Sequence, residues 1–270
     1  MAATPSADDS LSNQPVLQRS EADGIATLTL NRPAARNSLS SELMSELAAA
    51  LEAIAAERSI RVVVLAAQGP AFCAGHDMKE LLANRNAAYY EATFRRSSQI
   101  MQAIVHLPQP VIAKVHGVAT AAGCQLVASC DLAVAADEVR FATPGVNIGL
   151  FCSTPMVALG RNVSRKRAME MLLTGEAIDA ATAADFGLIN RAVPPSELDR
   201  EVMELAAKIA AKSSLTVAMG KGAFYRQLDL DLGRAYDYAA EVMARNMLAR
   251  DAQEGLAAFL EKREPEWQDR

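Results

Sequence analysis

Short runs of β-branched and other apolar residues recur along the chain and predict buried strands. They cover residues 25–30, 61–66, 111–115 and 131–135. Between them lie segments with helical periodicity, such as residues 41–54, where Leu43, Leu47 and Ile54 fall on one face and Ser40 or Ser41 can cap the start. Alternating strands and helices favour an α/β fold with parallel strands.

The second half of the chain becomes helical. Helices are expected at residues 87–107, 164–174 and 180–186, and residues 188–193 are expected to be extended. After Pro195 the pattern is entirely helical, with an amphipathic period over 234–250 and 253–263 and soft breaks at Gly220, Gly222 and Gly233. The sequence therefore predicts a disordered tail (1–20), a core (21–195) and a C-terminal helical region (196–270).

Two loops of small residues each join a strand to a helix. One is residues 116–123, HGVATAAG, and the other is residues 69–77, GPAFCAGHD. The first amides of a helix lack intrahelical partners, and small side chains let a ligand approach them closely. Two such turns can aim two N–H donors at one oxygen and form an oxyanion hole. The pattern alone also fits ordinary strand–helix turns, and neither loop matches a nucleotide-binding motif.

Composition narrows the possible functions. The net charge of −5 disfavours a nucleic-acid partner, and 51% hydrophobic content suits one compact domain with a helical appendage. Four cysteines without a C-x-x-C motif and only three histidines predict reduced thiols and no metal site. No apolar run is long enough for a membrane span, and residues 1–24 resemble neither a signal peptide nor a presequence. These features predict a cytoplasmic protein.

From residue 24 to 267 the chain resembles the crotonase, or enoyl-CoA hydratase/isomerase, family. The matching motifs are LNRP (30–33), AFCAGHDMKE (71–80), the block 115–131 and MEMLLTG (169–175). Within the family, ATAAGCQLVASCD (119–131) looks most like the branch called enoyl-CoA hydratase domain-containing protein 3. The resemblance implies a crotonase β-spiral of repeated ββα units and a C-terminal helical layer that forms trimers.

The resemblance also implies a site for a coenzyme A thioester. The backbone amides of His76 and Ala122 would hold the thioester carbonyl, with Ala122 replacing the usual glycine; alternatively, His76 is a surface histidine after a turn. Coenzyme A, as part of the substrate rather than a separate cofactor, would contact Arg36, His76, Asp77, Met78, Lys79 and a neighbour's Lys262. Lys262 could instead serve only as a charge at a helix end. The expected assembly is a homotrimer or a dimer of trimers.

Both catalytic glutamates of the family are absent. Their positions hold Gln125 and Gly145, which carry no proton that titrates near pH 7. General acid–base groups contribute about 10²–10⁴-fold each, so hydratase chemistry should be weak or altered.

Other residues could contribute to chemistry. Ser153 aligns with the position of a nucleophile in a related dehalogenase, although it could simply cap a helix. Asp131 is more readily explained as a buried structural carboxylate, Asp77 as a partner of backbone amides, and Glu91 is a weak candidate on a helix that covers the site in relatives. Three functions remain open: an enoyl-CoA hydratase-like lyase, a non-catalytic acyl-CoA binding protein, and a thioester hydrolase or decarboxylase.

Overall fold

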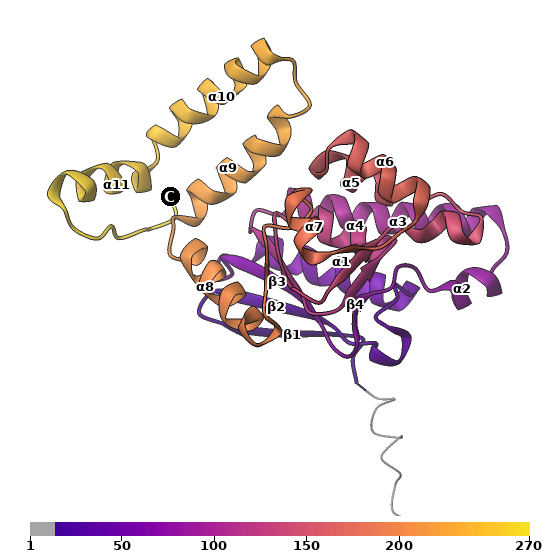
Figure 1. Ribbon diagram of the computed structural model, residues 1–270. Coiled ribbons are helices and arrows are strands. Elements are labelled where there is room, and N and C mark those ends of the chain that lie inside the picture. The colour runs from indigo at the N-terminus through magenta and orange to yellow at the C-terminus, as the bar shows by residue number, and fades with distance from the viewer. Residues whose placement is uncertain (1–13) are drawn as a thin grey trace, which may run out of the picture.

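A six-stranded sheet lies at the centre of the computed structural model, which describes residues 14–270 (Figure 1). Across the sheet, the strands are β1 (Leu17–Ala22), β2 (Ile25–Leu30), β3 (Val62–Ala67), β5 (Val111–Val115), β7 (Leu132–Ala136) and β10 (Arg191–Val193). β1 is antiparallel to β2, and the other neighbouring pairs are parallel. The residues of β3 and β5 are nearly all buried, as expected for parallel strands covered on both faces.

A smaller sheet runs beside it and contains β4 (Ala71–Cys73), β6 (Val118–Thr120), β8 (Arg140–Ala142) and β9 (Ile178–Asp179). β4, β6 and β8 are parallel, whereas β9 is antiparallel to β8. Each consecutive strand pair, β3–β4, β5–β6 and β7–β8, places one strand in each sheet before the chain enters a helix. This repetition confirms the predicted spiral of ββα units.

Helices cover the larger sheet. α1 (Ser41–Ala56) begins at Ser40, whose Oγ accepts a hydrogen bond from the Leu43 amide at 3.2 Å. Its apolar face is fully buried at Leu43 and Leu47, and burial of each such side chain stabilises the fold by about 1.5–3 kcal/mol. The remaining helices of the body are α2 (Met78–Ala83), α3 (Ala87–His106), α4 (Ala122–Ser129), α5 (Pro155–Asn162), α6 (Arg165–Thr174), α7 (Ala180–Asp185) and α8 (Leu198–Ala210).

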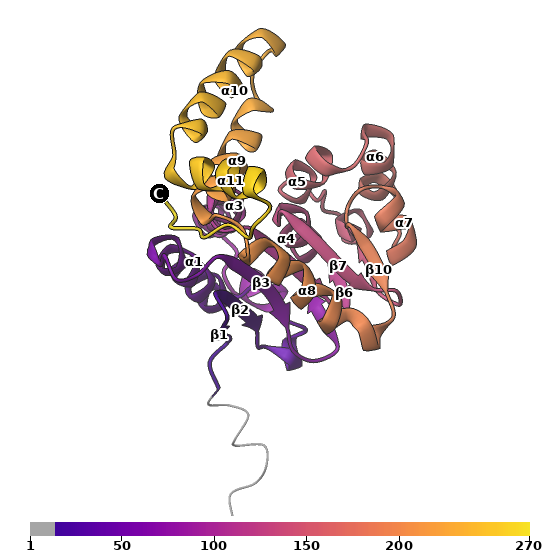
Figure 2. The same ribbon diagram turned by 90° about the vertical axis from the view of Figure 1, so that its left-hand side faces the viewer.

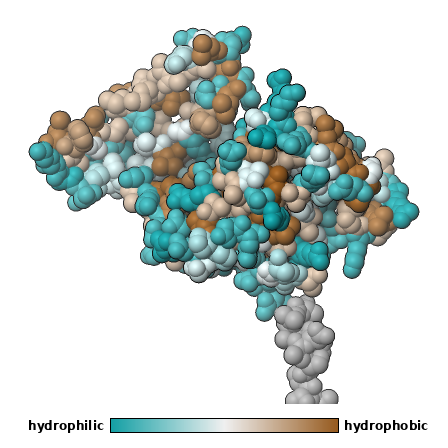
Figure 3. All heavy atoms as spheres, viewed as in Figure 1, coloured by the Kyte–Doolittle hydropathy of each residue, from teal (hydrophilic) through white to brown (hydrophobic). Residues whose placement is uncertain are grey.

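Three C-terminal helices form an arm that projects from the body (Figures 1 and 2). They are α9 (Ser214–Gln227), α10 (Leu232–Met247) and α11 (Arg250–Glu261), and neither α9 nor α10 contains a buried apolar residue. Large apolar side chains are exposed on them, including Leu232 at 76% and Phe259 at 80%, and brown hydrophobic residues are visible along the arm in Figure 3. Exposed apolar surface of this kind occurs at protein–protein, membrane and ligand interfaces.

The arm is fixed at its base. Lys221 of α9 is 7% exposed at its side chain, and its Nζ lies 2.6 Å from Asp131 Oδ2. The same ammonium group donates hydrogen bonds to the carbonyls of Ile104 and Gln109, so it also satisfies the C-terminal end of α3. Between residues 14 and 270, no helix combines the length and the apolar character needed to cross a membrane.

Several predicted boundaries differ from the structure. Residues 17–20 belong to β1 and not to a tail, while residues 1–13 lie outside the described residues. α8 packs against β3, β5 and β7, so the body continues beyond residue 195 and the projecting arm begins with α9. Gly220, Gly222 and Gly233 do not interrupt α9 or α10. Helix interiors tolerate single glycines at a cost of about 1 kcal/mol each, which is insufficient to break these helices.

Candidate active site

The two small-residue loops meet in space. β4 and β6, which form the middle of these loops, are adjacent and parallel, so the residues after each strand leave the sheet at the same end. Gly75 has φ +98°, and a Cβ built on it would lie 3.0 Å from Ala121 Cβ and 3.4 Å from the Ala122 nitrogen. Thr120 Oγ1 also donates a hydrogen bond to the Ala74 carbonyl at 3.2 Å. Only glycine permits this backbone conformation and this close approach.

The start of α4 is tightly constrained. A Cβ on Gly123 would lie 2.0 Å from the carbonyl oxygen of Cys73, so only glycine can occupy this position. Ala121 adopts φ 50° and ψ −116°, a conformation that costs of order 1–3 kcal/mol for a residue with a side chain. Its amide donates to the Ala142 carbonyl at 2.9 Å. The Ala122 amide, at the first position of the helix, therefore has no intrahelical acceptor.

The His76 amide is also available, because of its place in a parallel bridge. Leu39 pairs with His76 through a parallel bridge in which the Leu39 amide donates to Gly75 and the Asp77 amide donates to Leu39. That bonding pattern leaves the His76 N–H directed away from Leu39. Within residues 14–270, neither the His76 amide nor the Ala122 amide donates a hydrogen bond to another backbone segment. Both predicted donors thus lie on the contacting loops.

The imidazole of His76 is largely buried, although His76 as a residue remains partly exposed, so it differs from the fully exposed histidine considered from the sequence. Its ring packs edge-on against Phe94 of α3, with the ring centroids 5.1 Å apart. Burial lowers the pKa of this imidazole to about 4, so the ring is neutral at pH 7. Its Nε2 atom is buried and finds no hydrogen-bond partner among residues 14–270.

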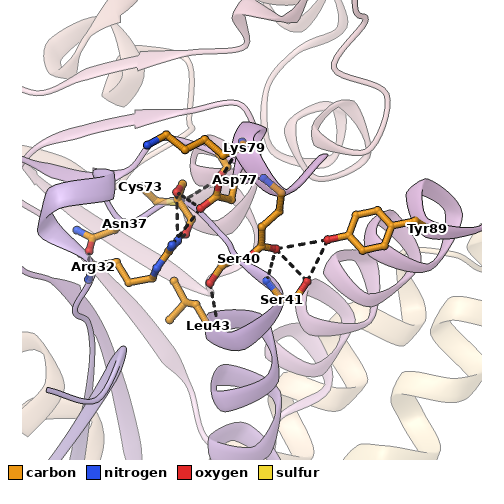
Figure 4. A network of polar contacts seen from close by, with 12 residues as sticks. Arg32, Asn37, Ser40, Ser41, Leu43, Cys73, Asp77, Lys79 and Tyr89 are labelled. Atoms are coloured by element: carbon orange, nitrogen blue, oxygen red, sulfur yellow. Dashed lines mark hydrogen bonds and ion pairs between the residues drawn. The ribbon is translucent and has the colours of Figure 1, made fainter. Parts of the chain in front are cut away.

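Asp77 has a structural role at the end of this loop, where it caps α2 and pairs with Arg32 (Figure 4). Its Oδ1 accepts hydrogen bonds from the amides of Lys79 and Glu80 at the start of α2, as predicted, and its Oδ2 lies 3.0 Å from Arg32 Nη2. Burial opposes ionisation, but the hydrogen bonds from Arg32 and from the two amides outweigh it and keep the pKa of Asp77 below its usual value. Asp77 is therefore a helix cap and not a free base.

The residues predicted to contact coenzyme A fall into two groups. Arg36, Met78 and Lys79 are exposed beside the first loop, and the Arg36 carbonyl accepts a hydrogen bond from the Ala74 amide. Lys262 follows α11 at the end of the arm, and α11 and α2 lie at opposite ends of the molecule in Figure 1. Because of this separation, Lys262 cannot reach the loop of its own chain.

Gln125 is one turn into α4 and is only 4% exposed. Its Oε1 is buried without a partner, and no hydrogen bond joins its side chain to the described part of the protein. Thr143, which the sequence analysis did not single out, has a side chain in the same condition. Its neighbour Ala142 accepts the hydrogen bond from Ala121, so Thr143 adjoins the start of α4. The motif that contains Gly145 also contains Thr143, but an isolated threonine carries no chemical signal in the sequence.

Residue 145, where the resemblance expects the second glutamate, has no room for a side chain. Gly145 lies in the 3-10 helix Pro144–Ile148, and its φ is not in the left-handed region. A Cβ at residue 145 would lie 2.8 Å from the Leu150 carbonyl oxygen and 2.9 Å from Cys152 Sγ. Burial raises the pKa of the Cys152 thiol, so this residue offers no thiolate at neutral pH.

Within the part of the chain that the structure describes, the Ser153 side chain makes no hydrogen bond to a base. It is exposed, and its Oγ donates to the Phe151 carbonyl at 3.3 Å. The expectation that Ser153 caps α5 is wrong, because Thr154 holds the capping position and its side chain makes no capping hydrogen bond. A serine needs an adjacent base to act as a nucleophile.

The other two carboxylates considered, Asp131 and Glu91, are paired with other residues. Asp131 accepts hydrogen bonds from Tyr225, from Lys221 and from the Val111 amide, so its structural role is confirmed. Glu91 is exposed and pairs with Arg95 on its own helix.

The chain is similar to known proteins over nearly its whole length. The profile of the family described as enoyl-CoA hydratase/isomerase matches residues 20–270. The human protein named enoyl-CoA hydratase domain-containing protein 3, mitochondrial, is 49% identical over 245 residues, which cover 91% of this chain and 81% of the relative. A crystal structure of an enoyl-CoA hydratase from Mycobacterium smegmatis is 55% identical, with a TM-score of 0.93, and the match covers 94% of this chain and 99% of that one. The crystal structure of the human domain-containing protein 3 is 48% identical, with a TM-score of 0.91 and coverage of 94% and 100%.

These comparisons confirm the family resemblance, including the branch, and correct one expectation. The predicted cytoplasmic location is contradicted, because relatives from rat, mouse and human that are 48–49% identical are named as mitochondrial. The composition of the first two dozen residues was therefore an inadequate guide to location.

Proposed function

Because the chain belongs to the enoyl-CoA hydratase/isomerase family, we propose that it binds a coenzyme A thioester with the carbonyl oxygen between the amides of His76 and Ala122. The observation that carries this proposal is the contact between Gly75 and Ala121–Ala122, which brings two strand–helix loops together. Both donors are backbone amides of loops that contact each other, so they are already in place when a negative charge develops on the oxygen. Loss of one such donor typically costs about 2.7–4 kcal/mol of transition-state stabilisation.

The reaction we propose is an enoyl-CoA hydratase-type lyase reaction with weak or altered acid–base chemistry. Gln125 has no proton to transfer near pH 7, and Gly145 has no side chain. The nearby carboxylate Asp77 caps α2 and pairs with Arg32, and Asp131 is held by Lys221 and Tyr225. Binding and polarisation of the thioester remain possible without these acids, whereas rapid addition of water is not expected.

A non-catalytic acyl-CoA binding protein is the second candidate. Two observations favour it: the carboxylate of Asp77 is paired with Arg32, and there is no room for a side chain at Gly145. Neither position then offers an acid or base, whereas the amides of His76 and Ala122 remain in place. A thioester hydrolase or decarboxylase that uses Ser153 is less well supported, because among residues 14–270 the Ser153 hydroxyl donates its hydrogen bond to the Phe151 carbonyl and not to a base.

The proposed assembly is a homotrimer or a dimer of trimers. The exposed apolar side chains of the arm and the distance of Lys262 from its own loop support contact between copies. In such an assembly, Lys262 would approach the coenzyme A of a neighbouring copy, with Arg36 and Lys79 at the rim of that site. Coenzyme A would enter as part of the substrate, and no separate cofactor is needed.

Calorimetric titration with acetyl-, butyryl- and crotonyl-CoA, followed by mass spectrometry of the products, tests this proposal. Addition of water to crotonyl-CoA would identify a lyase, release of free acid a hydrolase, and binding without a product a binding protein. Failure of a folded protein to bind any thioester would contradict the proposed function itself.

A further inference from the structure

The last seven residues of the chain, 264–270, fold back onto the start of α11, and we call them the C-terminal strap. The Asp251 amide donates a hydrogen bond to the Arg270 carbonyl at 3.0 Å. The Asp251 carboxylate accepts hydrogen bonds from the amides of Gln268 at 2.8 Å and Asp269 at 3.0 Å. Asp251 is only 1% exposed, and a buried carboxylate needs such donors to remain charged. The strap is therefore bound to the first turn of α11.

The strap is also joined to the base of the arm and to the body. Asp269 Oδ1 accepts a hydrogen bond from the Ser214 amide at 2.8 Å, at the first residue of α9, and lies 3.1 Å from Arg61 Nη2. Arg61 immediately precedes β3 of the large sheet. The Trp267 indole donates to the Ala211 carbonyl at 2.9 Å, between α8 and α9. The strap therefore connects α11 with α9 and with the body.

α11 has little apolar packing of its own to fix its orientation. Among the residues of this helix, only Asp251 and Ala258 are buried. Helices of about this length are marginal in isolation, so their stability comes from tertiary contacts. A Cβ built on Gly255 would lie 3.1 Å from Trp267 Cη2, so the indole ring of the strap lies against the helix. Contacts with the strap therefore determine much of where α11 lies.

Lys262 lies at the point where α11 passes into the strap, and its backbone is held on both sides. It caps α11 in the left-handed region, with φ 56°, and the following amide, of Arg263, donates to the Ala258 carbonyl at 3.0 Å. The Arg263 guanidinium lies 2.6 and 3.0 Å from the two carboxylate oxygens of Glu254. Glu254 also accepts a hydrogen bond from the Glu266 amide of the strap at 2.9 Å. Lys262 itself is exposed, so a free cationic side chain projects from a fixed backbone.

We propose that the C-terminal strap is a positioning element, which holds Lys262 through Asp251 and Asp269 where its ammonium group meets the 3′-phosphate of coenzyme A on a neighbouring copy. A group that is already in place loses less conformational freedom on binding, so a fixed backbone strengthens this contact. The inference rests on the proposed function, because it needs coenzyme A bound within reach of a neighbour's Lys262. Asp251 and Asp269 are positioning residues, since their carboxylates bind the strap, α9 and Arg61 and act on the ligand through Lys262.

The test compares the affinities for coenzyme A and dephospho-coenzyme A by calorimetry, because these two probes differ only in the 3′-phosphate. Wild-type protein should prefer coenzyme A by about three- to tenfold, the range that one net contact provides. Asp269→Ala releases the strap from α9 and from the body. This variant should lose most of the preference for coenzyme A, while its affinity for dephospho-coenzyme A changes little.

Three further variants separate positioning from a general defect. In a Lys262→Ala background, Asp269→Ala should have no further effect on the preference, because both changes remove the same contact. Asp269→Asn keeps an oxygen for the Ser214 amide and tolerates the positive φ of 56°, so it should retain part of the preference. Asp199→Ala is the control, since it removes a carboxylate that pairs with Lys114 of the body, and it should leave the preference unchanged.

Trp267→Ala weakens the strap independently and repeats the test if Asp269→Ala does not fold. It removes both the hydrogen bond to Ala211 and the ring that lies against α11. The preference for coenzyme A should fall in this variant as well, with the wild-type assembly state retained in light scattering.

The outcomes separate the two proposals. A lower thermal unfolding midpoint with an unchanged preference in a folded strap variant would show a merely structural role and overturn the inference. Loss of the preference together with loss of the wild-type assembly state would overturn it too, because the strap would then build the interface instead of positioning Lys262. If wild-type protein binds acyl-CoA but does not distinguish the two probes, the inference is wrong while thioester binding stands. If no thioester binds, the proposed function fails and the inference fails with it.

Discussion

Cys152 occupies the space that a side chain at residue 145 would need. Its Sγ lies 2.9 Å from the Cβ position of Gly145, and the Leu150 carbonyl oxygen closes the other side at 2.8 Å. The family's second glutamate is therefore absent from the sequence, and the space that its side chain would need is also occupied by Cys152 and the Leu150 carbonyl. Introducing glutamate at both expected positions would disturb this loop, so the acid–base hypothesis is better tested at Gln125 alone.

The packing at this position predicts that Gly145→Ala destabilises the protein by about 1–3 kcal/mol, because contacts this short force the loop to shift. Urea unfolding measures the effect. The penalty should be smaller in a Cys152→Ala background, where the sulfur is absent. Gly160→Ala is the matched control, since a Cβ there meets no atom within 4 Å. Equal effects at residues 145 and 160 would contradict the steric argument.

Ala122→Val should weaken acyl-CoA binding by about tenfold or more, because Ala122 is fully buried and the added methyl groups must shift the start of α4, which carries the donor amide. The affinity for free coenzyme A, which has no thioester carbonyl, should change little. Calorimetry on one protein preparation gives both values. Unchanged acyl-CoA affinity would place the carbonyl elsewhere.

Gln125→Glu should raise the rate of crotonyl-CoA hydration by about 10²-fold over a slow wild-type rate, because it restores one general acid–base group. The surrounding apolar residues would raise the pKa of the new carboxyl and keep part of it protonated near pH 7. Gln125→Met is the control and should not gain activity. A wild-type rate on the order of 10 s⁻¹ or more would show that another residue supplies the proton.

Lys262→Ala should weaken coenzyme A binding by about three- to tenfold, and should affect dephospho-coenzyme A much less, if this lysine meets a neighbour's 3′-phosphate. Lys208→Ala, at an exposed position on α8, should leave both affinities unchanged. Light scattering on the same samples gives the assembly state. A monomer that still discriminates the two ligands would disprove the contact between copies.

His76 should make folding stability depend on pH. Its pKa is lowered from 6.5 to about 4 in the folded protein, so the unfolded chain binds more protons in this range. The resulting stability is fully present above about pH 6.5 and is lost as the pH falls toward 4. Between pH 7 and pH 5, the wild type should lose about 2 kcal/mol more unfolding free energy than His76→Phe. If the unfolding free energies of the two proteins change equally with pH, the imidazole is not buried in solution.

The sequence by itself determined the local elements. β2 spans the predicted residues 25–30, and α1 begins at Ser40, because strand alternation, helical periodicity and capping depend on neighbours within a few residues. The family motif also identified both loops, including Gly75 and Gly123, whose contacts the structure explains. Conversely, local glycine content wrongly predicted breaks in α9 and α10.

Only the tertiary structure decided how distant segments share space. The filling of the Gly145 position by Cys152, the burial of the His76 ring against Phe94 and the anchoring of the arm by Lys221 and Asp131 each join segments far apart in the chain. Whether the Gln125 Oε1 atom has a hydrogen-bond partner likewise depends on every residue around it. Such relationships follow from packing and burial in three dimensions, for which a one-dimensional pattern carries no periodic signal.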